Sequence, residues 1–260
     1  MINAPTSEPP KANWEMKTLG EVCLTTAGGT PLKSKREYYE NGDIPWLLSG
    51  EVCQKEITSS KNFITRIGVE NSSAKLYPPD SVLIAMYGAT AGQAGILRFE
   101  ATSNQAVCAI LPNEQYLPEF IYYFFLNEKK TLVAKAAGNA QPNISQKKIR
   151  DTSIPVPPLA EQERIVGILD EAFEGIEAAT AQAQKNLHNA RELFQSVLQS
   201  TFSPKGDDWV EKPLGEVCST TAGGTPLKSK REYYENGDIP WLLSGEVCQK
   251  EITSSKNFIT

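Results

Sequence analysis

The segment that decides the fold lies at residues 159–201 and reads LAEQERIVGILDEAFEGIEAATAQAQKNLHNARELFQSVLQST. It contains no proline, and its only glycines are Gly167 and Gly175. Because proline is the residue that a helix interior tolerates least, this uninterrupted run predicts one long helix. At a rise of 1.5 Å per residue, such a helix spans roughly 60 Å.

Apolar side chains recur along this helix in alternating steps of four and three residues. The positions are Leu169, Phe173, Ile176, Thr180, Ala183, Leu187, Ala190, Phe194, Val197 and Thr201. A heptad pattern of this length is typical of a coiled-coil seam. The helix extends well past its own domain, whose radius of gyration is about 15 Å. We therefore expect the eight apolar positions to pack against a partner helix, in a dimer.

The residues before the helix predict one mixed domain. Strands are expected at 44–48, 81–87, 94–97 and 106–111, between turn signals. Helices are expected at 118–130 and at 130–137, and Ser145 is expected to cap a short turn. The prolines of residues 154–158 require an extended connector. The expected fold class is α+β: a curved antiparallel or mixed sheet with helices, followed by the long coiled-coil helix.

A duplication follows the helix. Residues 209–260, the trailing copy, repeat residues 14–65, the leading copy, at a constant offset of 195. Only four positions differ: Glu15/Val210, Met16/Glu211, Thr18/Pro213 and Leu24/Ser219. A period this long indicates a duplicated domain and not a solenoid. The expected organisation is a flexible lead at 1–13, a domain at 14–157, the helix at 158–203, and a linker with the truncated second copy at 204–260.

The charge balance is uneven along the chain. The net charge of −5 divides into +1 for residues 1–157, −4 for 158–203 and −2 for 204–260. The acidity therefore resides mainly on the helix. A near-neutral domain can still bind nucleic acid if its cations share one face.

Catalytic motifs are not apparent in the sequence. His188 is the only histidine, and the five cysteines are not spaced as zinc ligands. There is no Walker A loop and no nucleophile elbow, and Asp80 and Glu100 read as isolated carboxylates. The cysteines are expected to be small buried thiols in a reducing, cytoplasmic setting, since neither a signal peptide nor an apolar membrane span is evident. The sequence thus favours a binding protein with no metal or cofactor of its own.

Five stretches carry a resemblance to a known family. They are residues 44–52 (IPWLLSGEV), 81–93 (SVLIAMYGATAGQ), 103–106 (SNQA), 138–145 (GNAQPNIS) and 154–162 (IPVPPLAEQ). In this order they resemble the DNA-specificity subunit of type I restriction–modification systems. The last two stretches are the most specific, and the resemblance extends over essentially the whole chain after Asn13.

The resemblance implies a subunit that reads double-stranded DNA and catalyses nothing itself. Family members usually hold two recognition domains apart with two helices in an antiparallel coiled coil. That coil also docks methyltransferase subunits, which bind S-adenosylmethionine, and restriction subunits can join. This chain has one domain, one helix and the start of a second domain. The resemblance therefore implies a half-length form that pairs with a second copy and reads an inverted repeat.

A DNA reader needs cations for phosphates and planar polar groups for base edges. The candidate residues are Lys33, Lys35, Arg36, Tyr38, Tyr39, Gln93, Gln141, Asn143, Lys129 and Lys130. The first five are expected in an exposed loop, although Glu37 and Glu40 between them also fit a merely solvated loop. Gln93 either reads adenine or caps a turn. Gln141 and Asn143 either touch DNA or brace the domain against the helix, and the two lysines either contact phosphate or face solvent.

Two questions stay open from the sequence. The acidic helix also fits a coiled-coil adaptor without DNA specificity, which salt-dependent DNA binding would distinguish. The trailing copy cannot close a domain alone, because the strands after Ile64 have no second copy. It is either disordered, loosely docked near the helix end, or in competition with the leading copy of a partner chain for the same place.

Overall fold

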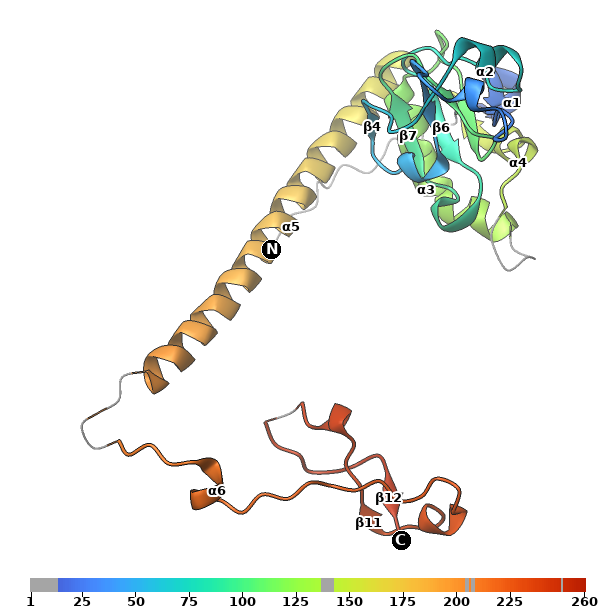
Figure 1. The fold of residues 1–260 in the computed structure, drawn as a ribbon. Coiled ribbons are helices and arrows are strands. Elements are labelled where there is room, and N and C mark those ends of the chain that lie inside the picture. The colour runs from blue at the N-terminus through green and yellow to red at the C-terminus, as the bar shows by residue number, and fades with distance from the viewer. Residues whose placement is uncertain (1–13, 137–142, 204–205, 207–208, 249) are drawn as a thin grey trace. The chain divides into compact units, whose positions relative to one another are not determined.

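A computed structural model describes residues 14–136, 143–203, 206, 209–248 and 250–260. The chain divides into two compact units, Met1–Leu187 and His188–Thr260 (Figure 1). The first unit holds the mixed domain with the greater part of the long helix. The second holds the end of that helix and the trailing copy.

A five-stranded sheet forms the centre of the first unit. Its order is β2 (Thr25–Ala27), β9 (Val107–Ile110), β6 (Val82–Ala85), β7 (Ala94–Leu97) and β4 (Glu56–Ile57). All pairs are antiparallel except β4 with β7, which is parallel. The predicted mixed sheet is therefore confirmed. Every residue of β6, β7 and β9 is buried, which explains why these strands read as continuous apolar runs.

Two smaller sheets attach the leading copy to the rest of the domain. One has the order β5 (Phe63–Ile64), β3 (Ile44–Leu47) and β8 (Thr102–Ser103), with β3 and β8 parallel. The other pairs β1 (Met16–Thr18) with β10 (Ser153–Pro155). The leading copy is thus interleaved with later strands, and its fold depends on pairings that are distant in sequence.

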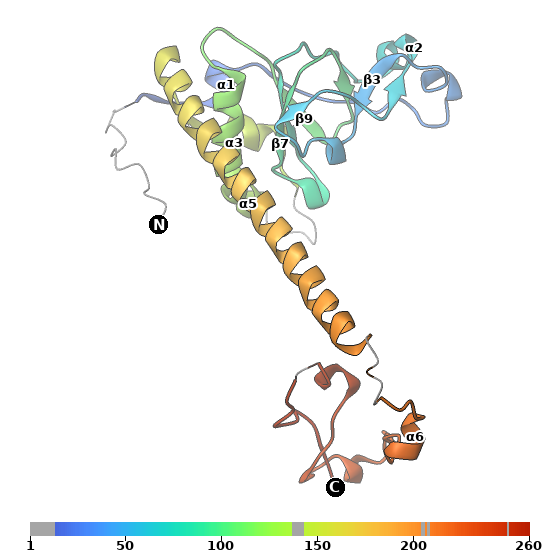
Figure 2. The same cartoon turned by 90° about the vertical axis from the view of Figure 1, so that its left-hand side faces the viewer.

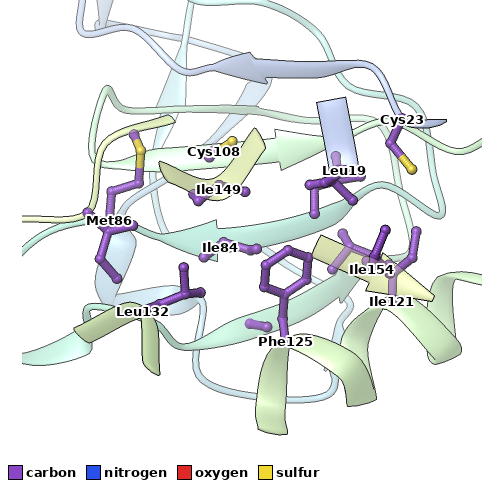
Figure 3. Close-up of a cluster of buried hydrophobic side chains, with 14 of the residues drawn as sticks. Leu19, Cys23, Ile84, Met86, Cys108, Ile121, Phe125, Leu132, Ile149 and Ile154 are labelled. Atoms are coloured by element: carbon purple, nitrogen blue, oxygen red, sulfur yellow. The ribbon is translucent and has the colours of Figure 1, made fainter. Parts of the chain in front are cut away.

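Helix α3 (Pro118–Ala136) covers one face of the central sheet. Its Phe125 and Leu132 are fully buried near Ile84 of β6 in the main core cluster, which also holds Ile149 and Ile154 (Figure 3). The prediction of two helices meeting at residue 130 was wrong. Residues 126–136 contain good helix formers and neither glycine nor proline, so nothing ends the helix there.

Short elements complete the domain. They are α1 (Leu19–Val22), α2 (Arg66–Glu70), α4 (Gln146–Arg150) and the 3₁₀ turns η1 (Arg36–Tyr38), η2 (Ser49–Glu51) and η3 (Gly88–Thr90). The predicted cap of α4 is present, because the Ser145 hydroxyl accepts a hydrogen bond from the Lys148 amide. A short cap of this kind fixes where the chain turns into β10.

Helix α5 (Leu159–Phe202) is one continuous helix of 44 residues, within one residue of the predicted bounds. Gln162 ties its first turn to the domain. The Gln162 Oε1 accepts from the Leu117 amide at 2.9 Å, and its Nε2 donates to the carbonyls of Gln115 and Pro157 at 2.8 and 2.9 Å. From Glu171 to Ser203 every residue is exposed. No described helix has the combination of length and apolar character that a bilayer span needs.

The second unit has little regular structure beyond the helix end. It contains α6 (Leu214–Val217), η4 (Arg231–Tyr233), η5 (Ser244–Glu246) and the pair β11 (Ile239–Pro240) with β12 (Phe258–Ile259). The register Ile239↔Ile259 repeats Ile44↔Ile64 of the leading copy. The trailing copy therefore keeps the local hairpin of the leading copy.

Candidate nucleic-acid interface

The start of α5 is clamped onto the domain by a polar and aromatic group. The Asp170 carboxylate accepts hydrogen bonds from Lys55 and Tyr123, and the Lys55 ammonium lies 5.0 Å from the centre of the Tyr123 ring. The Tyr123 ring stacks on Phe173, with centroids 5.6 Å apart and planes at 5°. Burial opposes ionisation of Asp170, but the two hydrogen bonds outweigh it and hold its pKa below the ordinary value. The clamp fixes the direction in which α5 leaves the domain.

The predicted seam therefore divides into two parts. Phe173 is engaged by its own domain, and Leu169 is half-buried beside Phe120 and Tyr123 of α3. From Ile176 onward the seam side chains are exposed: Ile176, Ala183, Leu187, Ala190, Phe194 and Val197. Leu193, directly before Phe194, and Leu198, directly after Val197, are also exposed and widen the apolar stripe at its end. Each of these two leucines stands next to a seam residue in the sequence, so the same heptad pattern could have indicated them.

The cationic loop of the leading copy is exposed, as expected. Lys33, Lys35 and Arg36 all face solvent, and two of them pair with neighbouring carboxylates: Lys35 Nζ lies 3.5 Å from Glu37 and Arg36 Nε lies 3.7 Å from Glu40. Such exposed pairs are weak and can exchange for phosphate contacts. Lys33 forms no ion pair among the residues that the structure describes.

The two tyrosines of this loop are less available than predicted. The Tyr39 ring meets Trp46 edge-on at 5.9 Å, and its hydroxyl donates to the Pro31 carbonyl. Burial raises the pKa of Tyr39. Tyr39 therefore packs on Trp46, and its contact with DNA stays a prediction. Tyr38 is half-buried, and its carbonyl accepts from the Thr65 amide at 2.9 Å, where it supports the neighbouring helix α2.

Arg66 is a candidate DNA-contacting residue that was not identified from the sequence. It begins α2, directly after Thr65, whose hydroxyl caps the helix by accepting from the Gly68 amide. Helix α2 packs against η1, because a Cβ placed on Gly68 would lie 2.7 Å from the Tyr38 carbonyl. Arg66 is exposed and so extends the cationic surface of η1. The cap signal at Thr65 could have located it.

A second group of candidates gathers around the turn between β6 and β7. Gly88 and Gly92 have φ values of +73° and +80°, which shape this turn. A Cβ on Gly92 would lie 3.0 Å from Lys129 Cγ, and an isolated bridge joins Tyr87 to Asn143. Gln93 is half-buried at the end of the turn, while Asn143 is exposed. The turn therefore brings Gln93, Lys129 and Asn143 into one region.

Three further placements complete this region. Lys130 is exposed on α3, next to Lys129. Tyr87 is an exposed aromatic side chain that was not singled out from the sequence, although its place at the end of a buried strand was a signal. Gln141 lies outside the described residues. Figure 2 shows β3 and α2 away from α5, and α3 beside α5.

The ionisable groups elsewhere in the domain have structural roles. Asp80, which the sequence left isolated, shares Arg98 with Glu56 and Glu119. Hydrogen bonds to Glu56, Glu119 and Asp80 raise the pKa of Arg98 against the effect of burial. Among the described residues, no three His, Cys, Asp or Glu side chains converge as metal ligands would.

The prediction of buried thiols holds for only two cysteines. Cys23 and Cys108 are buried, and burial raises the pKa of Cys108 to about 12. Cys53, Cys218 and Cys248 are exposed, so the prediction was wrong for these three. Cys53 follows the short turn η2, which places it outside the core. Cys218 is the counterpart of the buried Cys23, and it is exposed because the strands that cover the leading copy are absent around it; Cys248 is the counterpart of Cys53, which is exposed as well.

Comparison with known proteins identifies the family. Residues 11–187 match the family described as the type I restriction modification DNA specificity domain. The chain is 34% identical over 194 residues to the EcoR124I/EcoR124II specificity subunit of Escherichia coli, covering 70% of this chain and 48% of that protein. It is 25% identical over 268 residues to the MjaIX specificity subunit of Methanocaldococcus jannaschii, covering 95% and 61%.

The fold is shared with a solved relative. A chain from a structure on complex assembly and conformational transition of the type I R-M system superposes with a TM-score of 0.60 at 23% identity, covering 76% of this chain and 47% of that chain. The present chain spans 48% and 61% of the length of the two curated relatives. Since the family match covers the mixed domain and α5 as far as Leu187, the chain belongs to the type I restriction–modification DNA-specificity family.

Proposed function

We propose that this chain is a non-catalytic DNA-specificity subunit that pairs through α5 and positions methyltransferase subunits on a bipartite, palindromic target. The observation that carries the proposal is the clamp of Asp170 and Phe173, which joins a domain of this family to a helix with an exposed apolar seam. One domain reads one half-site, and the paired helices hold the second domain at a fixed distance.

The exposed cations of the domain determine how it binds DNA. Lys33, Arg36 and Arg66 surround η1 on the exposed side of the leading copy, and Lys129 and Lys130 lie near the second group. These five supply phosphate contacts, and Gln93 and Asn143 carry the amides that can read base edges. With a net charge near neutral, the domain binds weakly by itself, so we expect its methyltransferase partner to add electrostatic affinity.

The free part of the seam sets the spacing of the two domains. It begins at Ile176, because Phe173 is used by the domain, and ends at Thr201. Antiparallel pairing centred on this stretch separates the two Phe173 residues by roughly 46 Å at 1.5 Å per residue. This is about one and a third turns of B-DNA, whose turn measures about 34–36 Å. We therefore expect two inverted half-sites whose centres lie more than one helical turn apart.

The partner subunits supply the chemistry in this proposal. S-adenosylmethionine binds to the methyltransferase and not to this chain, and restriction subunits join the same assembly to cleave DNA. A coiled-coil adaptor without DNA specificity is the competing function. The exposed cations of η1 and the turn bearing Gln93 favour the DNA reader, since an adaptor needs neither.

The direct test is the methylome of a host carrying this gene with its methyltransferase gene. The expected result is one methylated motif made of two inverted half-sites separated by a fixed number of unread base pairs. A motif without inverted symmetry would contradict pairing of identical chains, and a host without any new motif would contradict the specificity function.

A binding experiment tests the η1 cations separately. The chain with its methyltransferase is titrated onto duplex DNA at several salt concentrations. Wild type is compared with a quadruple variant in which Lys33, Arg36 and their trailing-copy counterparts Lys228 and Arg231 are all replaced by Gln. Each lost phosphate contact should reduce the slope of log K against log salt by about 0.9. Lys185→Gln, on the exposed surface of α5 away from the seam, is the control for loss of a cation outside the proposed interface. Equal slopes for the control and the quadruple variant would remove η1 from the interface.

A further inference from the structure

The trailing copy has the same local structure as the leading copy. Tyr234 meets Trp241 edge-on at 5.8 Å, compared with 5.9 Å for Tyr39 and Trp46. The Trp241 amide donates to Asn257 at 2.8 Å, as the Trp46 amide does to Asn62. The segment around β11 and β12 therefore folds without the rest of the recognition domain.

The strands that need distant partners are missing from the trailing copy. In the leading copy, β1, β2 and β4 pair with β10, β9 and β7. The equivalent residues 211–213, 220–222 and 251–252 form no strand. Residues 220–222 and 251–252 are identical to β2 and β4 of the leading copy, whereas 211–213 differ from β1 at Glu211 and Pro213.

The apolar face that is buried in the leading copy is open in the trailing copy. Leu47 is 0% exposed and its counterpart Leu242 is 43% exposed. Val52 and Val247 differ in the same way, at 0% and 64%. An open apolar face of this kind marks a surface that a partner covers. The leading copy itself shows which partner fits it: the strands β7, β8, β9 and β10 that follow it in the chain.

All four sequence differences avoid that face. Glu15, Met16 and Leu24 are exposed in the leading copy, and Thr18 is half-buried. Thr18 uses its amide to hydrogen-bond Glu21 within the copy, so Pro213 loses a local cap and no bond to another strand. The residues that are buried in the leading copy are identical in the trailing copy: Leu19, Cys23, Ile44, Trp46, Leu47, Val52, Ile57 and Ile64.

Two glycines give independent support. A Cβ on Gly28 would lie 2.1 Å from the Asn104 carbonyl, and one on Gly29 would lie 2.2 Å from the Ala74 amide nitrogen. We call a copy seated when it is packed into the domain with its strands paired to β7, β8, β9 and β10. Both positions therefore require glycine in the seated leading copy. Gly223 and Gly224 have nothing within 4 Å, so the trailing copy needs these glycines only when it is seated in the same way.

We infer that the trailing copy of one chain takes the place of the leading copy in a second chain, pairing with the partner's β7, β8, β9 and β10. The inference rests on the proposed pairing of α5. In an antiparallel pair centred on the free seam, Phe202 of one chain lies opposite Gly175 of the other, roughly 24 Å along the helix from Leu159, where α5 begins after β10. Residues 203–213 can reach roughly 36 Å from there when extended.

The exchange leaves the number of seated copies unchanged, because each seated trailing copy displaces a leading copy. It therefore contributes a link between the two chains and little additional buried surface. The cations of η1 are identical in η4, so a seated trailing copy presents the same side chains to DNA. The exchange locks the pair without altering the target.

A cycle of glycine variants tests the exchange in the full chain. Gly223→Val should unfold at the wild-type midpoint, because the leading copy can still be seated and the added side chain meets nothing in an unseated trailing copy. Gly28→Val prevents seating of the leading copy, so the trailing copy should replace it and preserve cooperative unfolding at a lowered midpoint. The double variant has no copy that can be seated and should lose the cooperative transition. If Gly28→Val and the double variant unfold identically, the exchange does not occur.

A mixing experiment identifies the occupant as a second chain. The tagged double variant is expressed alone or with untagged wild type, and proteolysis of the tagged chain is followed. Wild type should supply its trailing copy and protect the tagged chain severalfold. If Gly28→Val is protected when it is alone, yet wild type fails to protect the double variant, seating occurs within one chain and the inference is wrong.

These outcomes are separable from the proposed function. A wild-type chain that dimerises and binds DNA while the glycine cycle shows no coupling would refute the exchange alone. A wild-type chain that stays monomeric with its methyltransferase at working concentrations would remove the α5 pairing, and with it both proposals.

Discussion

Replacing Gln162 by methionine should weaken the junction between the recognition domain and α5. Gln162 is fully buried, and its amide group makes three hydrogen bonds, to the Leu117 amide and to the carbonyls of Gln115 and Pro157. Methionine has nearly the same volume and helix propensity, so the change removes the polar contacts while packing is largely kept. It also leaves one amide and two carbonyls without this partner.

The expected loss follows from the number of bonds. Each intramolecular hydrogen bond contributes about 1 kcal/mol net, so three account for about 3 kcal/mol of the unfolding free energy. For a domain of this size, 1 kcal/mol corresponds to about 2–4 °C in the unfolding midpoint. We therefore expect Gln162→Met to lower the midpoint by roughly 6–12 °C.

The assay is urea and thermal unfolding followed by circular dichroism. Gln199→Met is the matched control, because Gln199 lies on the same helix, is exposed and faces away from the seam. It should change stability by less than about 0.5 kcal/mol. If Gln162→Met fell in that range as well, the three hydrogen bonds would have no net stabilising effect and the role assigned to Gln162 would be wrong.

Three further substitutions test the seam, the turn and the clamp. Leu187→Glu places a charge in the free seam and should convert the dimer to monomer in sedimentation equilibrium, whereas the outward-facing Lys185→Glu should not; a variant that stays dimeric would exclude the seam. Gly92→Val puts a β-branched residue at φ +80° against Lys129 and should cost more than about 1 kcal/mol in urea unfolding, with a smaller loss showing that the turn relaxes. Because the folded pKa of Asp170 lies below its ordinary value of 3.8, its stabilisation is present above that pH and is lost as pH falls through the folded value. The deficit of Asp170→Asn should therefore be clear at neutral pH and vanish in acid, and a constant deficit would show that the carboxylate charge is unimportant.

The duplication separates what a sequence dictates locally from what its surroundings add. Residues 36–38 and 231–233 form the same 3₁₀ turn, and both copies form the same two-strand hairpin. These elements depend on nearby hydrogen bonds. Residues 25–27 form a strand, however, while the identical residues 220–222 do not. No pattern within the segment could have predicted this difference, because it depends on whether β9 is available.

The same distinction explains which strands were predicted. The four strands expected from the sequence contain apolar runs and all were found, within one or two residues of the expected bounds. The short strands β2, β4, β8 and β10 were not predicted, since two or three residues carry too little periodicity to be recognised. Strands β2, β4 and β8 form because they lie at the edges of sheets whose centres were predicted, and β10 forms because it pairs with β1.

For the candidate site, exposure was more predictable than role. Lys33, Lys35 and Arg36 could be placed on the surface because a charged run after a turn has no other stable location. Tyr39 could not be assigned, since its ring faces Trp46 only after the hairpin has folded. Asn143 and Gln93 lie in one region because of the bridge between Tyr87 and Asn143 and the turn between β6 and β7. Both features join segments that are distant in the sequence. A contact surface assembled from several loops is not encoded in any one of them.

The helical seam shows most clearly how one pattern can serve two partners. The heptad begins at Leu169, and nothing in its spacing distinguishes its first members from the later ones. In the folded chain, Phe173 stacks on Tyr123 and Asp170 accepts from Lys55, so the first turns of the stripe are covered by the domain itself. The stripe then continues from Ile176 with its side chains exposed. The covered and exposed parts share one register. In the proposed pair, the same line of residues therefore sets the orientation of the domain and the position of the partner helix. A change in the clamp should then alter the proposed distance between two half-sites as directly as a change in the seam.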